Sequence, residues 1–166
     1  MGLPLEIERK FLVTSKAFMT ESSGRILIRQ GYLSADPQRV VRVRLTEDLE
    51  SGEQGAFLTI KGPSPDHGLS RLEWEQPIDY QDGIELLALC VPFPVEKTRY
   101  LVSVQDLTFE VDVFHGSNQG LIVAEIELPD PEAQFTEPDW LGTEVTQQTK
   151  YTNASLAQSP FSTWTD

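Results

Sequence analysis

Ionisable residues two positions apart recur in this chain, within runs that otherwise have the composition of β-strands. In the first run, Leu5–Val13, the side chains of Glu6, Glu8 and Lys10 share one face, because alternate residues of a strand point to opposite sides. The same spacing gives Arg42 and Arg44, Thr59 and Lys61, Arg71, Glu73 and Glu75, Lys97 and Arg99, Glu110 and Asp112, and Glu125 and Glu127. Carboxylates bind hard divalent cations, and Arg and Lys bind phosphate oxygens, so these residue types suit a metal-bound polyphosphate.

The alternation by itself admits two interpretations of these charged faces. In a β-sandwich each sheet would turn one face to water, which is the commoner arrangement. In a closed barrel the charged faces would converge on a lumen, and the apolar faces would be covered from outside. Solvated faces usually mix Ser, Thr, Asn and Gln with Lys, whereas these positions are almost purely acidic or basic, so we favour the lumen.

Rows of like charge that face each other across a narrow barrel are unfavourable unless a ligand neutralises them. Two like charges about 4 Å apart cost on the order of 4 kcal/mol at an effective dielectric near 20. A phosphate chain would neutralise the basic rows, and Mg²⁺ or Mn²⁺ would neutralise the acidic rows and bridge to phosphoryl oxygens. The chemistry that such a lumen predicts is phosphoryl transfer to water, in which catalysis consists mostly of positioning and charge neutralisation.

Loop compositions rich in Gly, Pro, Asp and Ser separate the runs and make the chain mainly β, in an α+β class. The predicted strands are Leu5–Val13, Arg25–Ser34, Val40–Thr46, Ala56–Lys61, Ser70–Ile78, Glu96–Val104, Leu107–Phe114 and Leu121–Leu128. Short helices are predicted at Thr14–Glu21, at Asp79–Cys90 with Asp79 as the N-cap, and near Thr146–Gln158.

Length and composition predict one globular domain over residues 1–166, with a hydrophobic fraction of 39%. The lone Cys90 excludes an internal disulfide. No long apolar run and no signal-like segment occur, so we expect a cytoplasmic protein that does not associate with membranes.

The net charge of −13 argues against a broad basic surface of the kind that binds nucleic acid. The Lys and Arg residues lie mostly in the predicted strands, and after Arg99 the only basic residue is Lys150. Cations concentrated at particular places in an acidic protein predict a small anionic partner. The sequence does not indicate the oligomeric state.

With these charged pairs in order, the chain resembles the CYTH superfamily, also called triphosphate tunnel metalloenzymes. Glu6 to Lys10 match the ExExK signature of that family, and the resemblance extends from about Leu5 to Lys150. The further matching segments are RQGYLS from Arg29, RVR from Arg42, LTIK from Leu58, SRLEWE from Ser70, EKTRY from Glu96, FEVDVF from Phe109 and AEIEL from Ala124.

The resemblance implies an eight-stranded antiparallel barrel that forms a tunnel with a charged lumen, with a few helices packed outside. It also implies divalent metals and a triphosphate inside the barrel. The short chain is most similar to the compact bacterial inorganic triphosphatases, which predicts hydrolysis of tripolyphosphate to pyrophosphate and phosphate. The alternatives are a thiamine triphosphatase or class IV adenylyl cyclase of the same fold, or a module that binds polyphosphate without cleaving it.

The metal ligands expected from this resemblance are Glu6, Glu8, Glu125 and Glu127, because the first and last strands adjoin when a barrel closes. The other acidic residues of the strand faces are expected either to bind a further metal or to hold Arg and Lys side chains. These second choices are Asp112, Glu110, Glu73 and Glu75.

The cations expected to grip phosphoryl oxygens are Lys10, Arg42, Arg44, Lys97 and Arg99. Arg71 is a further candidate, although it precedes two glutamates on its own face and could serve only to pair them. Lys150 is expected either at the tunnel mouth or in solvent, and we favour the mouth.

Lys61 is the candidate catalytic group, because a partly desolvated Lys among several cations can accept a proton from water. The hydroxyl of Tyr32 could relay that proton or position the water. Gly31 beside it could permit a bulge, so parity does not fix the face that Tyr32 takes. In the alternative mechanism Glu127 orients a metal-activated water and Lys61 acts only through its charge.

Overall fold

A computed structural model describes residues 4–66 and 69–165 of the chain. Eight antiparallel strands form a closed ring, in the order β1, β5, β4, β3, β2, β6, β7 and β8. Their bounds are β1 Leu5–Val13, β2 Gly24–Ser34, β3 Val40–Asp48, β4 Gln54–Lys61, β5 Ser70–Ile78, β6 Val95–Val104, β7 Leu107–Phe114 and β8 Ile122–Glu127. The predicted eight-stranded antiparallel barrel is therefore confirmed.

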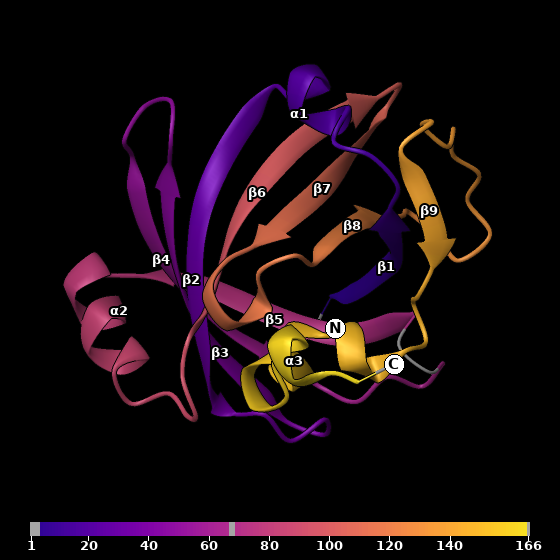
Figure 1. Cartoon of the computed structure of the whole chain (residues 1–166). Helices are drawn as coiled ribbons and strands as arrows, with labels where there is room; N and C mark the ends of the chain where they lie inside the picture. The colour runs from indigo at the N-terminus through magenta and orange to yellow at the C-terminus, as the bar shows by residue number, and fades with distance from the viewer. Residues whose placement is uncertain (1–3, 67–68, 166) are drawn as a thin grey trace.

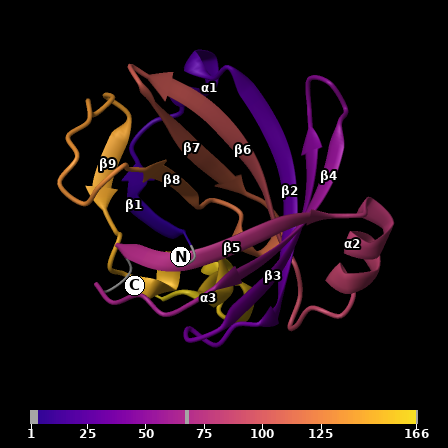
Figure 2. The same cartoon turned by 180° about the vertical axis from the view of Figure 1, so that it is seen from behind.

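The ring closes at β1, which pairs with β8 along one edge and with β5 along the other. The pairing with β5 is short, since only Leu5, Ile7 and the residue between them have partners there. The rest of that edge pairs with β9, Leu141–Glu144, a strand that the sequence pattern did not reveal. Figures 1 and 2 show β9 lying beside β1 on the outside of the barrel.

The apolar faces of the strands point outward and are covered, as expected. Helix α2, Tyr80–Leu87, packs on β3 and β4 through Leu87 and the buried residues Val43, Leu45 and Ala56. Asp79 is its N-cap, accepting hydrogen bonds from the backbone of Gln81 and Asp82, as predicted. Figure 1 shows α2 on the flank of the barrel beside β3 and β4.

A second apolar cluster covers the opposite wall, formed by β1, β6, β7 and β8. Phe18 from the short helix α1, Phe18–Glu21, and Trp140 from the segment before β9 are fully buried against Phe109. Burying large aromatic side chains contributes about 2–3 kcal/mol each. The segment that follows β8 thus takes on part of the covering role that was predicted for helices.

The C-terminal helix α3, Asn153–Gln158, does not pack on the outer wall; it lies across one end of the barrel (Figure 1). There the lumen-facing rows of β3, β6 and β7 end in apolar residues, Val40, Val95 and Phe114, and Leu156 of α3 is buried among them. The prediction of a few helices packed outside the barrel is confirmed: α1 and α2 lie on its wall, and α3 covers one end. The predicted helix from Thr146 is shorter than expected, since it begins with a 3-10 turn, η2, at Thr149–Tyr151.

Candidate active site

The charged faces converge on a cavity of about 720 Å³ inside the barrel. This volume lies within the usual range for small-molecule sites. Every barrel strand contributes to its wall, and the lining charged residues are Glu6, Glu8, Lys10, Arg42, Arg44, Lys61, Arg71, Glu73, Glu75, Arg99, Glu110, Glu125 and Glu127. The structure thus selects the lumen over the solvated sheet face.

Carboxylates from the first and last barrel strands lie together, as the closure argument predicted. Glu8 is directly opposite Glu127 across the β1–β8 pair, and Lys10 is opposite Glu125. Burial raises the pKa of Glu8 well above its ordinary value, and the carboxylates of Glu125 and Glu6 raise it further. This cluster therefore holds more negative charge than its own cations neutralise.

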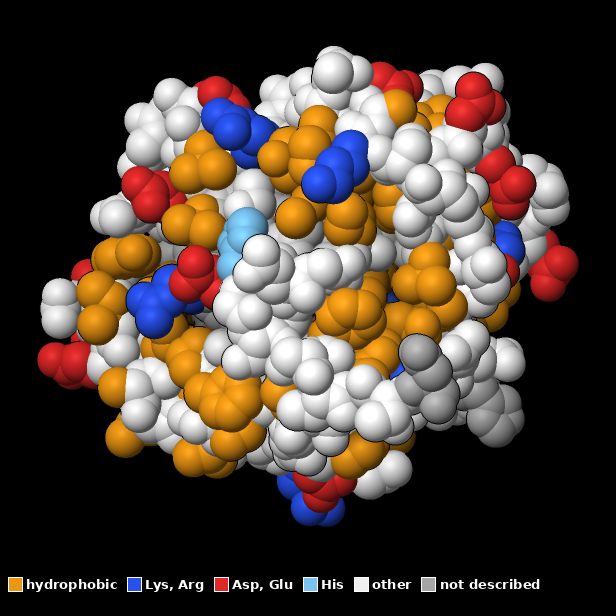
Figure 3. Space-filling view, in the orientation of Figure 1, with side chains coloured by type: hydrophobic (Ala, Val, Ile, Leu, Met, Phe, Trp, Pro, Cys, Tyr) orange, Lys and Arg blue, Asp and Glu red, His pale blue; other side chains and the backbone are white. Residues whose placement is uncertain are grey.

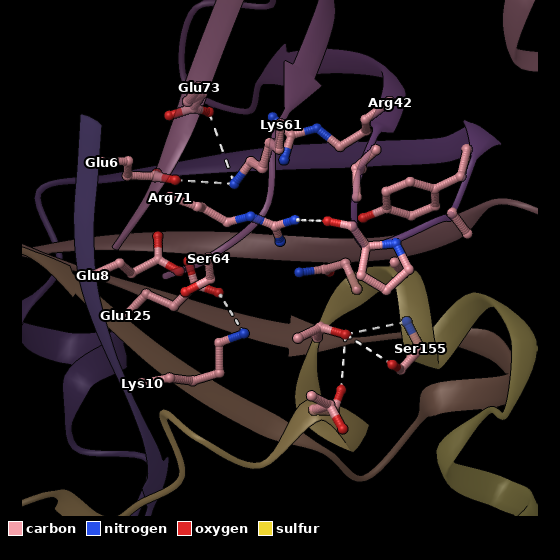
Figure 4. Close-up of a pocket in the computed structure, with 18 of the residues that line it drawn as sticks. Glu6, Glu8, Lys10, Arg42, Lys61, Ser64, Arg71, Glu73, Glu125 and Ser155 are labelled. Carbon is pink, nitrogen blue, oxygen red and sulfur yellow. Dashed lines mark hydrogen bonds and ion pairs between the residues drawn. The ribbon is translucent and has the colours of Figure 1, made fainter. Parts of the chain in front are cut away.

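Two of these acids are turned toward lysines. Lys61 Nζ lies 3.1 Å from Glu6 Oε2, and Lys10 Nζ lies 3.8 Å from Glu125 Oε1 (Figure 4). Although burial acts to raise it, the pKa of Glu125 is held well below its usual range by Lys10 and by Arg99. Among the residues that the structure describes, no three acidic, His or Cys side chains converge closely enough to enclose a metal ion.

The surroundings of Lys61 differ from those expected for it. Its Nζ lies 3.8 Å from Glu73 in addition to the contact with Glu6, so its nearest ion partners are carboxylates and not other cations. Figure 4 shows both carboxylates directed at the Lys61 amine. A role for Lys61 as a proton acceptor therefore requires that Glu6 take up a different partner.

The two arginines of β3, Arg42 and Arg44, both line the cavity. Arg42 donates to Thr59 at 3.0 Å and to Glu75 at 3.2 Å. The guanidinium of Arg44 has no acidic partner among the described residues; its Nε donates to the amide oxygen of Gln30 at 2.8 Å. Burial lowers the pKa of Arg44 to about 9, with the positive charges of Arg42 and Arg99 acting in the same direction. Arg44 therefore carries a charge without an acidic partner among the described residues, which suits the binding of an anion.

Lys97 and Asp112 are buried behind the cavity wall and do not line the cavity. Lys97 is fully buried, with Nζ 2.6 Å from Asp112 Oδ2 and 3.0 Å from Asn153 Oδ1 of α3. Burial lowers the pKa of Lys97 to about 7, although the Asp112 carboxylate acts in the opposite direction. Asp112 also accepts two hydrogen bonds from Arg99, at 2.8 and 3.0 Å. The structure thus places Lys97 behind the cavity wall and not on it, and it shows Asp112 holding Lys97 and Arg99.

Arg99 itself reaches the cavity from this buried network. Its third contact is with Glu110 Oε2, at 2.8 Å from Nη1. The acidic partners fix the guanidinium in place, since bidentate Arg–carboxylate pairs constrain geometry as well as contributing energy. Asp112 and Glu110 therefore hold a cation, which was one of the two roles considered for them.

Arg71 and Lys150 were also expected near phosphate. Arg71 lines the cavity but does not pair with the glutamates of its strand; it donates to the backbone carbonyls of Gly62 and Pro37. Lys150 stacks over the rings of Trp164, at 4.6 Å, and Tyr151, at 5.2 Å, and is not among the described residues that line the cavity. The preference of Lys150 for the tunnel mouth therefore stays a prediction, although its neighbours Thr149 and Thr152 line the cavity.

Tyr32 lines the cavity and is 4% exposed. Gly31 does not introduce a bulge before Tyr32. The register of β2 against β3 is regular through both residues and shifts only after Tyr32. A Cβ at position 31 would lie 2.5 Å from the Cβ of Cys90, so the glycine permits close packing on the outer face. Strand parity therefore places Tyr32 on the same face as Gln30.

With this geometry in view, the chain can be compared with known proteins. The CYTH domain matches residues 4–159, which include every strand of the barrel. The chain belongs to the CYTH family.

The relatives of this CYTH chain are similar over nearly their whole length. The inorganic triphosphatase of Acetivibrio thermocellus is 43% identical over 157 residues, covering 94% of this chain and 95% of that protein. The inorganic triphosphatase of Nitrosomonas europaea is 39% identical, covering 93% of this chain and 97% of that protein. A crystal structure of an inorganic triphosphatase has a TM-score of 0.62 at 32% identity, covering 92% of this chain and 97% of that one.

One part of the CYTH cavity wall was missed in the sequence. The C-terminal segment lines the cavity with uncharged polar residues, Thr146, Gln147, Thr149, Thr152, Asn153, Ser155 and Gln158. Thr152 caps α3 by accepting from the backbone of Ser155, and Figure 4 shows Ser155 facing the cavity. The run of Thr, Gln and Ser in TEVTQQTKYTNAS was the available signal, but charge alternation does not detect such residues.

On the face seen in Figure 3, Lys and Arg side chains are scattered singly and form no basic patch. Among the described residues, no helix is long and apolar enough to cross a membrane.

Proposed function

We propose that this chain hydrolyses inorganic tripolyphosphate to pyrophosphate and phosphate within the barrel cavity, with the help of Mg²⁺ or Mn²⁺. The observation that carries the proposal is one cavity in which an uncompensated acidic cluster lies across from cations of which Arg44 has no acidic partner among the described residues. A bound polyanion would pair with the cations, and divalent cations bound with it would neutralise the acidic cluster. The relatives named as inorganic triphosphatases, at 43% and 39% identity, support this substrate.

The acidic cluster fits divalent metal by its donor chemistry. Glu6, Glu8, Glu125 and Glu127 offer only carboxylate oxygens, which suit Mg²⁺ and Mn²⁺. The raised pKa of Glu8 supports the same assignment, because a cation would relieve the repulsion that raises it. When bound, the metal would neutralise phosphoryl oxygens and lower the pKa of a coordinated water.

The cations that line the cavity divide the work of binding. Lys10, Arg42, Arg44 and Arg99 are the groups that we assign to phosphoryl oxygens, with Lys61 as a further charge. Lys97 and Asp112 act behind the wall by fixing Arg99. Arg71 holds the loops that carry Gly62 and Pro37 at the rim of the cavity, because its guanidinium binds both backbone carbonyls.

Two residues remain candidates for the proton acceptor. Burial raises the pKa of Glu127, and the carboxylates of Glu6 and Glu110 raise it further, which makes Glu127 a better base toward water. Lys61 would serve only after losing its contact with Glu6. Lys61→Ala and Glu127→Gln, each assayed over pH, distinguish them, because removing the base abolishes one limb of the pH–rate profile.

A substrate panel tests the function itself. We expect release of phosphate from tripolyphosphate with Mg²⁺ or Mn²⁺ to exceed release from pyrophosphate, ATP and thiamine triphosphate. Faster cleavage of thiamine triphosphate, or formation of cyclic AMP from ATP, would assign the chain to an organic triphosphate. Binding of tripolyphosphate without turnover would identify a non-catalytic module.

A further inference from the structure

Gln30 is fully buried beneath the basic wall, at 0% exposure, and lies two residues before Tyr32 on β2. Across the β2–β3 pair it is directly opposite Arg44, while Tyr32 is opposite Arg42. Its side chain contacts both functional neighbours: Arg44 Nε donates to Gln30 Oε1 at 2.8 Å, and Gln30 Nε2 lies 3.4 Å from the Tyr32 hydroxyl. A buried amide thus joins a phosphate-binding candidate to a catalytic candidate.

The chemistry of Arg44 fixes which way this amide is turned. A guanidinium has only donors, so the atom of Gln30 that it contacts must be the carbonyl oxygen. The amino group of Gln30 then faces Tyr32, and it too can only donate. Tyr32 therefore uses an oxygen lone pair toward Gln30, and its own hydroxyl hydrogen is directed elsewhere.

The charged groups that act on the buried Tyr32 phenol are three cations of the cavity, Arg42, Arg44 and Lys10, and one carboxylate, Glu125. Burial raises the pKa of Tyr32 above its usual value, against the opposing charges of Arg42, Arg44 and Lys10. The phenol is thus protonated at neutral pH, and it lies within electrostatic reach of the groups assigned to phosphate. None of those cations accepts a hydrogen bond, and Glu125 is paired with Lys10 at 3.8 Å, so the Tyr32 proton suits an anion that the cations hold.

We propose that Gln30 is a positioning residue that directs the Tyr32 hydroxyl proton toward a phosphoryl oxygen of the bound chain and holds Arg44 against the same chain. The inference rests on the proposed function for the identity of that anion. It assigns Tyr32 the role of a hydrogen-bond donor to the substrate, in place of a relay for the proton of the attacking water. No covalent step is attributed to either residue.

The variant that isolates this role is Gln30→Glu, which changes only the donor end of the side chain. A carboxylate still accepts from Arg44, but it must also accept from Tyr32, so the hydroxyl proton turns away from the cavity. We expect kcat/KM for tripolyphosphate to fall roughly 10- to 100-fold, as for loss of one hydrogen bond to a charged group. Gln38→Glu, on the cavity-lining loop after β2, adds the same charge without touching Tyr32, and we expect a smaller loss.

A double-mutant cycle separates the hydroxyl from the added charge. In a Tyr32→Phe background, Gln30→Glu retains only its effect through Arg44 and its charge, so we expect it to cost about tenfold less than it does beside Tyr32. Gln30→Met, which removes both contacts without adding charge, gives a second cycle if the carboxylate variant folds poorly. Strict additivity in both cycles would overturn the proposal.

A measurement without substrate makes the inference independent of the proposed function. The ionisation of Tyr32 is read from tyrosinate absorbance as the difference between a protein and its Tyr32→Phe counterpart. We expect Gln30→Glu to raise the pKa of Tyr32 further, because the phenol then donates to a carboxylate, and Gln38→Glu to leave it unchanged. If Gln30→Glu leaves that pKa unchanged, Gln30 does not orient Tyr32. Absence of tripolyphosphate hydrolysis by the unmodified protein would contradict only the proposed function.

Discussion

Two clusters of charged residues lie side by side in the wall of this barrel, on β6–β7 and on β1–β8, and they differ in whether their charges are fully paired. In the β6–β7 cluster, Lys97, Arg99 and Asp112 are buried and use their charges on one another and on Glu110 and Asn153. In the β1–β8 cluster, Glu8 lies against Glu6 and Glu125, and its pKa is raised by burial and by their charges. The first cluster needs nothing further, whereas the second lacks positive charge.

The difference teaches how the same residue types can serve as framework or as binding site. A buried charge that is fully paired fixes geometry, and removing either partner is costly. A buried charge with insufficient partners stores repulsion that a ligand can relieve. On this argument the β6–β7 cluster orients Arg99, and the β1–β8 cluster is the one that we propose for the metal.

The largest expected effect is the loss of the centre of the complete cluster. Asp112→Asn leaves Lys97 and Arg99 buried without their shared carboxylate, so we expect a loss of about 3–5 kcal/mol in the free energy of unfolding. Urea denaturation measures it. Glu110→Gln is the matched control: the Glu110 side chain is 36% exposed and pairs with the same Arg99, so its loss should stay below about 1 kcal/mol. Equal losses for the two variants would erase the distinction between the clusters.

The opposite pattern is expected for the incomplete cluster. Glu8→Gln removes a proposed metal ligand and also a source of repulsion, so the protein without metal should be as stable as the unmodified one or more so. Affinity for Mn²⁺, measured by calorimetry, should fall about 10- to 100-fold, a range comparable to that for disturbed metal sites. If Glu8→Gln destabilises the protein and leaves Mn²⁺ binding intact, Glu8 belongs to the framework instead.

The incomplete β1–β8 cluster should also make the stability of the protein depend on pH. Because the folded pKa of Glu8 lies above its unfolded value of about 4.3, the folded state binds more protons between these two values. The stability of the metal-free protein should therefore fall as pH rises through this interval. Mg²⁺ should remove the decline, and so should Glu8→Gln, in melting temperatures recorded from about pH 4 to pH 8. A decline that persists in Glu8→Gln would assign it to another group.

The sequence predicted which residues belong to the charged faces of the barrel better than it predicted which of them are buried behind the cavity wall. Period-two alternation identified the lumen face of each barrel strand except β2, and the resemblance to CYTH proteins supplied the closure of β1 on β8. Lys10 and Lys97 look alike in that pattern. Lys97 nevertheless lies behind the wall. Val95, on the same face of β6, and Phe114, the partner of Lys97 on β7, pack in the apolar end of the barrel that α3 covers.

What escaped prediction depends on contacts between distant parts of the chain. The bond from Lys97 to Asn153 joins residues 56 positions apart, and although a helix was predicted in this segment, its place across the end of the barrel was not. Gln30 escaped for another reason: its face of β2 carries Ile26, Ile28 and Tyr32, so the charge alternation that marks the other strands is absent there. Its role emerges only from the atoms that it contacts.

The smallest expected effect concerns Lys150, which belongs to neither cluster. Its ammonium group stacks on Trp164 and Tyr151, so Lys150→Ala removes a cation–π contact worth about 0.5–1 kcal/mol at an exposed site. The KM for tripolyphosphate should change by less than about twofold, because the stacked amine is not directed at the cavity. Lys10→Ala, which removes a cavity-lining amine, provides the contrast and should raise KM at least about tenfold. A comparable rise for Lys150→Ala would mean that the C-terminal segment releases this lysine toward the substrate.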